Sequence, residues 1–468
     1  MIFNSNIFLF AFLPVVFTLF WIARGKQQRY VLLAIAGYVF YGYWDWRFCI
    51  LLAFSSIVSF VSGLMIDGTD SQQRKRAWVI GAVSVDLTLL GFFKYYNFVA
   101  ANLGVALGWL SVRAQPPVLH IILPIGISFY TFHTISYVVD VSKGRVKPTR
   151  NIAEYFTYVS LFSQLIAGPI VRYRQIEADL EQIDGPPRSD WIAIGIGFFV
   201  VGLIKKVIIA DHIGGGIDPI LAAYANGSIS AMSFGQAWIT AIGYTCQLYF
   251  DFSGYSDMAV GLGYLFSLRI PQNFDAPYRS LGIQDFWRRW HISLSTWLRD
   301  YLYIGLGGNR KGKRRMYVNI MIVMLLGGLW HGASWTFVIW GAYHGILLII
   351  DRLGSPFFRK LPPMLYRAQT FFLVIIGWVF FRATSFRMAG GWLRSMFTAG
   401  AARDAALPIA PMLPVWIGIA LAVVMFLPET WNFRFGTTRR WAAVYAAGFV
   451  LAYVFMNGTN SPFLYYQF

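Results

Sequence analysis

The stretch YVNIMIVMLLGGLWHGASW, Tyr317 to Trp335, decides the fold of this chain. Fourteen residues from Tyr317 to Trp330 carry no charge, and His331 follows them. A helix through His331 is about 22 Å long at ~1.5 Å per residue, whereas the hydrocarbon core of a bilayer is ~30 Å thick. A helix that starts at the preceding basic segment NRKGKRR therefore carries His331 to membrane depth. Because an ionisable group there is costly unless it faces a cavity or a partner, we expect a catalytic or relay role for His331.

Three glycines surround this histidine: Gly327, Gly328 and Gly332. Because they have no side chains, they would let a substrate or a neighbouring backbone approach the imidazole closely. Close packing of helices alone is the other explanation.

A second histidine lies forty residues upstream in WRRWHISLSTWLRDYLY, Trp287 to Tyr303. His291, Ser295 and Arg299 fall at i, i+4 and i+8, while apolar residues recur at helical spacing on another face. This pattern predicts an amphipathic helix at a membrane interface or a protein vestibule. From these residues alone, His291 either lines a site or hydrogen-bonds in the headgroup zone. Three nearby arginines, Arg288, Arg289 and Arg299, would attract an anionic donor, and Asp285 and Asp300 are candidate ion-pair partners for them.

Four segments together resemble the membrane-bound O-acyltransferase family: DFWRRWHISLSTWLRDYLYIGLGGNR, LWHGASWTFVIWGAYHG, QLIAGPIVRYRQI and YFDFSGYSDMAVGLG. The resemblance is strongest to the bacterial branch that supports O-acetylation of alginate and similar exopolysaccharides. It extends from about Phe8 to beyond Phe381. By this resemblance, His331 matches the principal catalytic histidine of the family and His291 matches its second histidine.

The resemblance also implies a reaction and its partners. Acetyl-CoA would be the cytosolic donor, used as a substrate with no cofactor bound, and the acetyl group would cross the bacterial inner membrane through a central tunnel. Periplasmic acetyltransferase partners would pass it to a polysaccharide acceptor. Two alternatives stay open: a D-alanyl transferase for teichoic acid, and, from a different class, a proton-coupled transporter with His331 in a proton relay.

The composition predicts one polytopic membrane domain, residues 1–468, with the catalytic stretch at 285–350. Hydrophobic residues make up 57% of the chain and charged residues only 13%, which favours an all-α protein of about 11–12 transmembrane helices plus re-entrant or interfacial helices. The net charge is +18, and the excess of Lys and Arg lies in short loops between apolar spans. Membrane topology and anionic lipids therefore explain this excess better than binding to nucleic acid does. With only Cys49 and Cys246, we expect no disulfide framework and no bound metal.

The distribution of basic loops predicts the orientation. The apolar run Ile7 to Ala23 is followed by Arg24, Lys26 and Arg29, which indicates a retained first span with its amino terminus outside. Twelve crossings with both termini outside fit the basic loops. The segment Thr384 to Pro411, rich in Ala, Gly, Met and Pro, is predicted to be an external loop that contacts a partner.

Acyl transfer from a thioester to a hydroxyl needs a base for the hydroxyl proton and donors for the carbonyl oxyanion. We find no GxSxG elbow, so we expect direct transfer with His331 as the base. The sequence does not identify the oxyanion donors. Six tryptophans of the stretch either wall a tunnel or form an interfacial belt: Trp287, Trp290, Trp297, Trp330, Trp335 and Trp340. Asp251 and Asp257 are expected to cap a helix or pair with Arg279 or Arg288 rather than act in catalysis.

Overall fold

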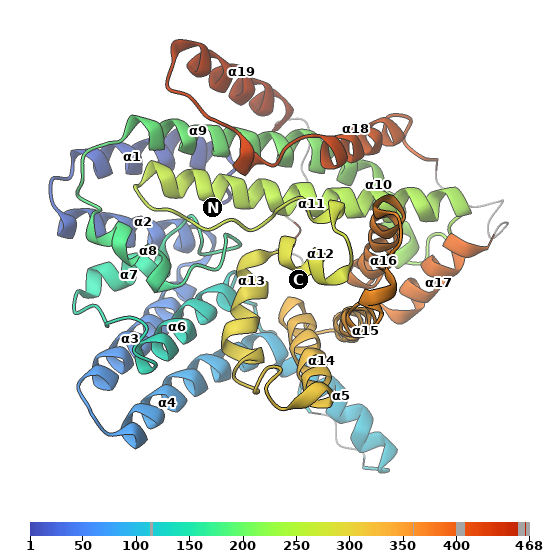
Figure 1. Ribbon diagram of the computed structural model, residues 1–468, viewed down its shortest axis with the longest axis horizontal. Helices are drawn as coiled ribbons and strands as arrows, with labels where there is room; N and C mark the ends of the chain where they lie inside the picture. Colours follow the sequence, from blue (N-terminus) through green and yellow to red (C-terminus); the bar gives the residue numbers. More distant parts are fainter. Residues whose placement is uncertain (113–115, 359, 399–407, 457–463, 465–468) are drawn as a thin grey trace. The chain divides into compact units, whose positions relative to one another are not determined.

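The computed structural model describes residues 1–112, 116–358, 360–398, 408–456 and 464, and this part of the chain is helical without strands (Figure 1). The all-α prediction is confirmed. The chain divides into two compact units. Unit 1 comprises Met1–Ile196 and Ala259–Pro271, and unit 2 comprises Gly197–Met258 and Gln272–Phe468. The single functional domain of residues 1–468 stays a prediction.

Unit 1 is built from short and medium helices that pack in neighbouring pairs, among them α2 with α7 and α3 with α6. Its elements are α1 (Leu13–Ile22, after a π turn at Phe8–Phe12), α2 (Lys26–Asp45), α3 (Arg47–Asp67), α4 (Gln72–Leu90), a π turn (Gly91–Tyr95), α5 (Tyr96–Trp109), α6 (Ile127–Ser142), α7 (Ile152–Ser160) and α8 (Tyr173–Glu181). Buried polar groups tie three of these helices together. Asp86 on α4 accepts hydrogen bonds from Ser55 Oγ on α3 at 2.6 Å and from Thr134 Oγ1 on α6 at 2.7 Å.

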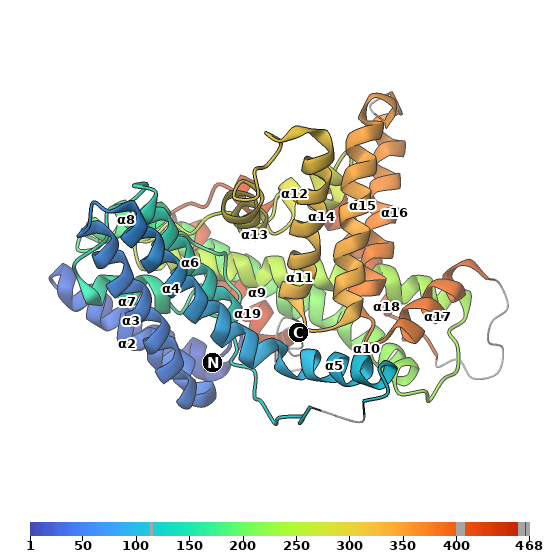
Figure 2. The same cartoon turned by 90° about the horizontal axis from the view of Figure 1, so that it is seen from below.

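Two helices, α9 (Ser189–Ile204) and α11 (Phe234–Leu265), have residues in both units. The other elements of unit 2 are a π turn (Lys205–Ala210), α10 (Asp211–Ala225), a 3₁₀ turn (Pro277–Arg279), α12 (Ile283–Arg289), α13 (Ile292–Trp297), a π turn (Leu298–Tyr303), α14 (Gly312–His331), α15 (Trp335–Phe358), α16 (Pro363–Arg382), α17 (Phe386–Phe397), α18 (Leu413–Phe426), a 3₁₀ turn (Thr430–Asn432) and α19 (Arg439–Met456). Helices α14, α15 and α16 lie side by side (Figure 2).

Glycines allow α14 and α15 to approach closely. A Cβ atom at Gly328 would meet the carbonyl oxygen of Phe337 and lie 3.3 Å from Cα of Gly341. A Cβ at Gly341 would in turn meet the carbonyl oxygen of Met324. Small residues at such a contact are the usual basis of tight helix packing in membranes.

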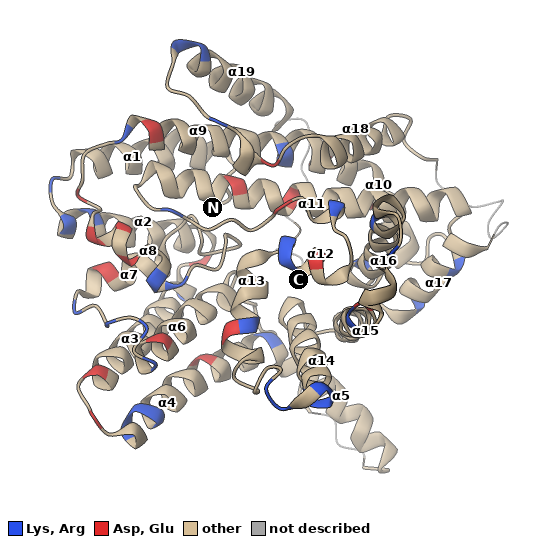
Figure 3. Cartoon of the chain, viewed as in Figure 1, with Lys and Arg blue, Asp and Glu red and all other residues tan. Residues whose placement is uncertain are grey.

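Five helical segments of the described chain are long and apolar enough to cross a membrane: Arg47–Asp67, Gln72–Trp109, Ser189–Ala225, Trp335–Phe358 and Pro363–Arg382. Two shorter apolar segments are Phe8–Ile22 and Leu413–Phe426. Figure 3 shows long uncharged stretches along the helices, with many of the charged residues near helix ends and in loops. The chain is therefore a multi-pass membrane protein, and the full count of 11–12 crossings stays a prediction. Helix α14, whose first turn is basic, is not among the five.

Two local predictions are wrong. The segment Trp287 to Tyr303 is not one amphipathic helix, because the backbone breaks at Trp290 and His291 between α12 and α13. The segment Thr384 to Pro411 is not a plain loop, because residues 386–397 form α17, which Ser385 caps by accepting from Met388 N at 3.1 Å. Residues 399–407 of that segment lie outside the described part of the chain.

The ion pairs expected for Asp251 and Asp257 are also corrected. Both carboxylates are buried, and their cationic partners are lysines of the π turn after α9 rather than arginines. Asp251 lies 2.6 Å from Lys206 Nζ, which is also 2.6 Å from Asp211 Oδ1. Asp257 accepts from Lys205 Nζ at 2.7 Å. We call these five residues the buried charge cluster.

Candidate functional site

His331 is the last residue of α14, and Trp335 begins α15 four residues later. The small residues between the helices permit this sharp turn, and Ser334 Oγ accepts a hydrogen bond from Thr336 N at 3.3 Å at the start of α15. The side chain of His331 is 6% exposed. The close contact of α14 with α15 therefore fixes the position of His331 in unit 2.

Aromatic rings surround the imidazole of His331. Ring centroids lie at 5.0 Å for Trp330, 5.2 Å for Trp340, 5.0 Å for Phe381 and 6.5 Å for Phe337. The Trp340 ring is nearly perpendicular to the imidazole, at 87°. The local environment of His331 is therefore apolar and its ring is held by neighbours from α14, α15 and α16.

His331 also lines a small cavity of about 120 Å³, which we call the His331 cavity. Its lining comes from α12 to α15 and is mostly apolar: Trp287, Leu294, Ser295, Leu298, Val323, Met324, Gly327, His331, Trp340 and Leu348. The three neighbouring glycines therefore differ in role. Gly327 lines the cavity, whereas a Cβ at Gly328 would meet the backbone of α15 and one at Gly332 would meet the ring of Phe337.

His291 occupies the break between α12 and α13, with a left-handed φ of 44° and 1% exposure. Backbone hydrogen bonds on both sides hold this conformation. Ile292 N donates to Asn273 O at 2.9 Å, and Asp275 N donates to Arg289 O at 3.0 Å. The loop at Asn273 thus closes against the break and fixes the direction of the His291 side chain.

The hydrogen bonds of Asn273 assign the tautomer of His291. Its Oδ1 accepts from Ser293 N at 3.2 Å and from Ser293 Oγ at 2.9 Å, and its Nδ2 donates to Ser256 Oγ at 3.1 Å. Because Oδ1 is an acceptor, the contact of 3.0 Å with His291 Nδ1 requires Nδ1 to carry the proton. The lone pair of the neutral imidazole is then on Nε2. Burial lowers the pKa of His291 to about 3, so the ring is neutral at physiological pH.

The indole of Trp330 is a neighbour of both histidine rings. Its ring centroid is 6.0 Å from that of His291 and 5.0 Å from that of His331. His291 also packs edge-on against Phe252 at 4.7 Å. The structure therefore brings both predicted histidines of unit 2 to one aromatic cluster.

The three predicted donor-binding arginines have different surroundings. Arg289 pairs with Asp285 at 3.1 Å, and Arg299 pairs with Asp300 at 2.7 Å, as expected for the two acidic residues. Arg288 is exposed and makes no ion pair among the residues that the structure describes. It is therefore the cation of the three that is available to a ligand.

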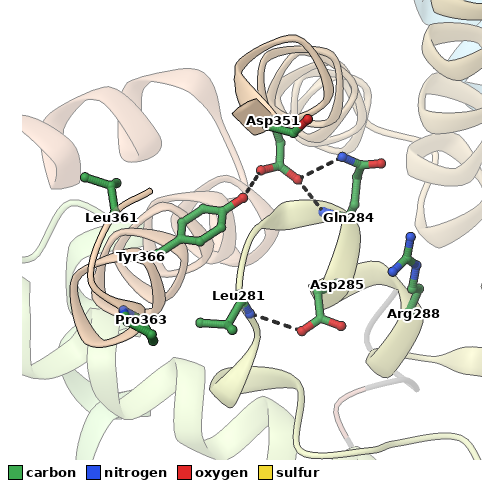
Figure 4. Close-up of a pocket in the computed structure, with 9 residues that line it drawn as sticks. Leu281, Gln284, Asp285, Arg288, Asp351, Leu361, Pro363 and Tyr366 are labelled. Carbon is green, nitrogen blue, oxygen red and sulfur yellow. Dashed lines mark hydrogen bonds between the residues drawn. The ribbon is translucent and has the colours of Figure 1, made fainter. Parts of the chain in front are cut away.

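Arg288 lines a second cavity of unit 2, of about 260 Å³, which we call the polar cavity (Figure 4). Asp351 at one side accepts from Gln284 N at 3.0 Å, from Gln284 Nε2 at 3.2 Å and from the hydroxyl of Tyr366. Asp285 accepts from Leu281 N at 3.1 Å. Both carboxylates are thus already engaged by donors of the protein, which leaves Arg288 as the group suited to an anion.

Two residues of this region were not predicted from the sequence. Asn273 orients His291 from a loop eighteen residues upstream, and no spacing rule points to it. His344 on α15 is fully buried behind Trp287 and Trp340, at 5.3 and 5.0 Å between ring centroids. The position of His344 one helical turn after Trp340 was the available signal.

Comparison with known proteins identifies the family of this chain. The sequence model of the membrane-bound O-acyltransferase family matches residues 15–389. The chain belongs to this family. As an O-acyltransferase it transfers an acyl group to a hydroxyl, and the resemblance of the chain to this family is confirmed.

Curated relatives of this O-acyltransferase carry three different names. A protein of Pseudomonas aeruginosa named "Probable alginate O-acetylase AlgI" is 46% identical over 407 residues, which are 86% of this chain and 75% of the relative. A peptidoglycan O-acetyltransferase of Helicobacter pylori is 38% identical over 429 residues, covering 85% of this chain and 80% of the relative. A teichoic acid D-alanyltransferase of Streptococcus thermophilus is 30% identical over 240 residues, covering 48% of this chain and 56% of the relative.

Proposed function

We propose that this O-acyltransferase takes an acetyl group from cytosolic acetyl-CoA and moves it across the bacterial inner membrane for O-acetylation of an exopolysaccharide such as alginate. His331 is the general base. The observation that carries the proposal is the imidazole of His331 in the wall of a small, apolar cavity. The names of the relatives that cover most of the chain support acetyl as the acyl group and a glycan as the final acceptor.

The size of the His331 cavity supports a short acyl group. Its volume is about 120 Å³, and an acetyl group, with three heavy atoms, fits this space. The apolar lining also keeps water from the thioester, which favours transfer over hydrolysis.

The polar cavity supports an anionic donor. Arg288 would bind a phosphate of coenzyme A, because its guanidinium has no carboxylate partner among the described residues. Helix α12 connects the two cavities, since Arg288 and Gln284 line the polar cavity and Trp287 lines the His331 cavity. In this proposal the phosphates bind on one side of α12 and the thioester reaches His331 on the other.

The reaction follows from these positions. The imidazole of His331 takes the proton of the acceptor hydroxyl while the hydroxyl oxygen attacks the thioester carbonyl carbon. A carbon–oxygen bond forms, the carbon–sulfur bond breaks, and the thiolate leaves and recovers the proton from His331. His291, neutral and oriented by Asn273, positions the donor.

The test measures donor binding and single-turnover transfer for two variants. His331→Ala should bind acetyl-CoA normally and lower turnover roughly 10²- to 10⁴-fold, because a general base contributes that much. His291→Ala should need more donor and keep measurable turnover at saturation, because it loses a binding contact. A His331→Ala protein with near-normal transfer would refute the central role of this residue.

The identity of the acyl donor distinguishes the proposed activity from two other activities. A D-alanyl transferase would take its acyl group from a D-alanyl carrier and leave acetyl-CoA intact. A proton-coupled transporter would consume no thioester. Incubation of the purified protein with labelled acetyl-CoA, labelled D-alanyl thioester and an acceptor hydroxyl distinguishes the three activities by which thiol is released.

A further inference from the structure

The loop of residues 273–276, which we call the Asn273 loop, closes against the break between α12 and α13 and is itself held by a carboxylate. Glu429 Oε1 accepts hydrogen bonds from Ala276 N at 2.8 Å and from the hydroxyl of Tyr249 at 2.7 Å. Glu429 lies beyond residues 15–389, which the sequence model of the family matches. The support of the loop is therefore a feature that the family match does not contain.

Two residues with a left-handed backbone lie at this contact, one on each side. Ala276 in the Asn273 loop and His291 in the break both have a φ of 44°. This conformation is costly for a residue that has a Cβ, so it persists where neighbouring contacts impose it. The backbone hydrogen bonds to the loop do this for His291, and the N–H of Ala276 is held by Glu429. Glu429 therefore helps to impose the conformation on which the break depends.

The second hydrogen bond of Glu429 supports the same loop through aromatic packing. Tyr249 is buried, and its ring lies 5.8 Å from that of Phe274 in the loop. The Phe274 ring lies 5.1 Å from that of Trp290, the residue that directly follows α12. One carboxylate oxygen therefore fixes both the backbone of the loop and an aromatic side chain that packs on it.

The Asn273 loop in turn fixes the ends of two helices that line the cavities of unit 2. Its two backbone hydrogen bonds join it to the last residue of α12 and to the first residue of α13. On α12, Arg288 lines the polar cavity and Trp287 lines the His331 cavity. Glu429 lines neither cavity. Loss of its contacts would therefore act on a bound donor through the position of α12.

We propose that Glu429 is a positioning residue for donor binding: through the Asn273 loop it holds α12 so that Arg288 faces the donor in the polar cavity. This assignment rests on the proposed function, because it needs a phosphate of acetyl-CoA at Arg288. A carboxylate oxygen suits the task, since it accepts two hydrogen bonds at once and donates none when ionised.

The experiment uses the full-length protein in detergent or vesicles and variants that separate reach from charge. Glu429→Asp keeps the charge but is shorter by one methylene, so its oxygen no longer reaches Ala276 N. Glu429→Gln keeps the length and an acceptor oxygen. Glu429→Asp and Glu429→Ala should raise the KM for acetyl-CoA about 3- to 10-fold and change kcat much less, because a hydrogen bond that supports binding is lost. Glu429→Gln should stay within about 2-fold of the wild type.

Thr430→Val is the matched control. The hydroxyl of this neighbouring residue donates to Asp257 of the buried charge cluster at 2.7 Å rather than accepting from the loop. The control should lower thermal stability and leave the KM unchanged. Asn273→Ala weakens the same loop at its contact with the break. The double variant Glu429→Asp/Asn273→Ala should therefore raise the KM by less than the product of the two single effects.

The tautomer of His291 reports the geometry of the break without any donor. Solid-state NMR of protein with ¹⁵N-labelled histidine would measure it, with the signals of this residue assigned from their loss in His291→Asn. Wild type should show protonation at Nδ1 alone, because Asn273 Oδ1 accepts from it. Glu429→Asp should add the tautomer protonated at Nε2, whereas Glu429→Gln and Thr430→Val should not.

Four outcomes overturn the assignment. Unchanged KM and tautomer in Glu429→Asp and Glu429→Ala exclude it while the proposed function survives. An equal rise in KM for Thr430→Val shows a general loss of structure instead. Fully multiplicative effects of Glu429→Asp and Asn273→Ala show that Glu429 does not act through the loop. A wild type that releases no thiol from acetyl-CoA in the presence of acceptor overturns the proposed donor, and this assignment with it.

Discussion

His291 is held by a loop residue rather than by its own helix. Asn273 accepts from His291 Nδ1 and from both donor groups of Ser293 through one oxygen atom. This arrangement fixes which nitrogen carries the proton. Mutation of Asn273 would remove the contact that sets both the tautomer and the orientation of the His291 ring. The chemistry of His291 therefore depends on a contact that forms only in the folded unit.

The low pKa of His291 makes stability depend on pH. The folded pKa is about 3 and the ordinary value is 6.5, so between these values the unfolded chain binds a proton that the folded chain does not. Protonation of His291 in the unfolded chain should therefore lower the free energy of unfolding as the pH falls below about 6.5. At pH 5 the free energy of unfolding should be about 2 kcal/mol lower than at neutral pH. Thermal unfolding of wild type and His291→Asn at pH 7.5 and pH 5 measures this, because the variant lacks the contribution. An equal pH dependence in both proteins would contradict it.

The sequence placed both histidines and the acidic partners of Arg289 and Arg299, because each lies within a few residues of its motif or its partner. The sequence did not predict the contact of Asn273 with His291. It also did not predict that Arg288 differs from Arg289 and Arg299 in having no ion pair among the described residues. Those features depend on contacts between distant segments, such as the loop at Asn273 closing against the break at His291. The left-handed backbone at His291 has no signal in the local sequence, because φ is set by that loop.

At the scale of elements, the contact of α14 with α15 positions His331. Gly341→Ala would add a Cβ against the carbonyl oxygen of Met324 and 3.2 Å from Cα of Leu325. Because backbone atoms cannot move aside locally, the helices must separate, at a cost of about 1–3 kcal/mol. We expect a lower unfolding temperature and weaker transfer, measured in detergent.

Gly418→Ala on α18 is the matched control for that prediction. Nothing lies within 4 Å of a Cβ at Gly418, so alanine should be neutral or stabilise the helix by up to ~1 kcal/mol. If both variants behave alike, the close approach of α14 and α15 does not limit stability.

The sequence predicted these helices better than their ends. The apolar runs of α14 to α16 mark long helices directly, whereas the single helix expected over Trp287 to Tyr303 is two helices and a π turn. Helical spacing of apolar residues is compatible with both arrangements. The break at His291 forms because tertiary hydrogen bonds replace helical ones there, and periodicity does not report them.

At the scale of the whole molecule, the orientation in the membrane is a testable prediction. The NRKGKRR loop and the loop at Arg24 to Arg29 should be cytoplasmic, because basic loops resist translocation. Cys49 and Cys246 would first be replaced, and single cysteines then placed in each loop of the cysteine-free variant. An impermeant thiol reagent should not label Gly312→Cys in intact cells. Labelling there would reverse the predicted orientation.

Polymer acetylation should require further proteins. The family resemblance implies separate periplasmic acetyltransferases, and we expect the single purified chain to be insufficient to modify a polysaccharide. Reconstitution with acetyl-CoA and alginate in vesicles tests this, with the product followed as ester-bound acetate. Efficient acetylation by this chain alone would exclude a partner requirement.

The buried charge cluster bears on how the chain is made. Lys205 and Lys206 follow α9, and their carboxylate partners Asp251 and Asp257 lie on α11, which is synthesised later. A lysine at the centre of a membrane helix costs about 2.5–3.5 kcal/mol to insert without a partner. Lys206 already has Asp211 as a partner within the segment Ser189–Ala225, whereas Lys205 has its carboxylate partner, Asp257, on α11. A nascent chain that ends before Asp257 therefore holds Lys205 without this partner, so full insertion of the segment should follow the synthesis of α11.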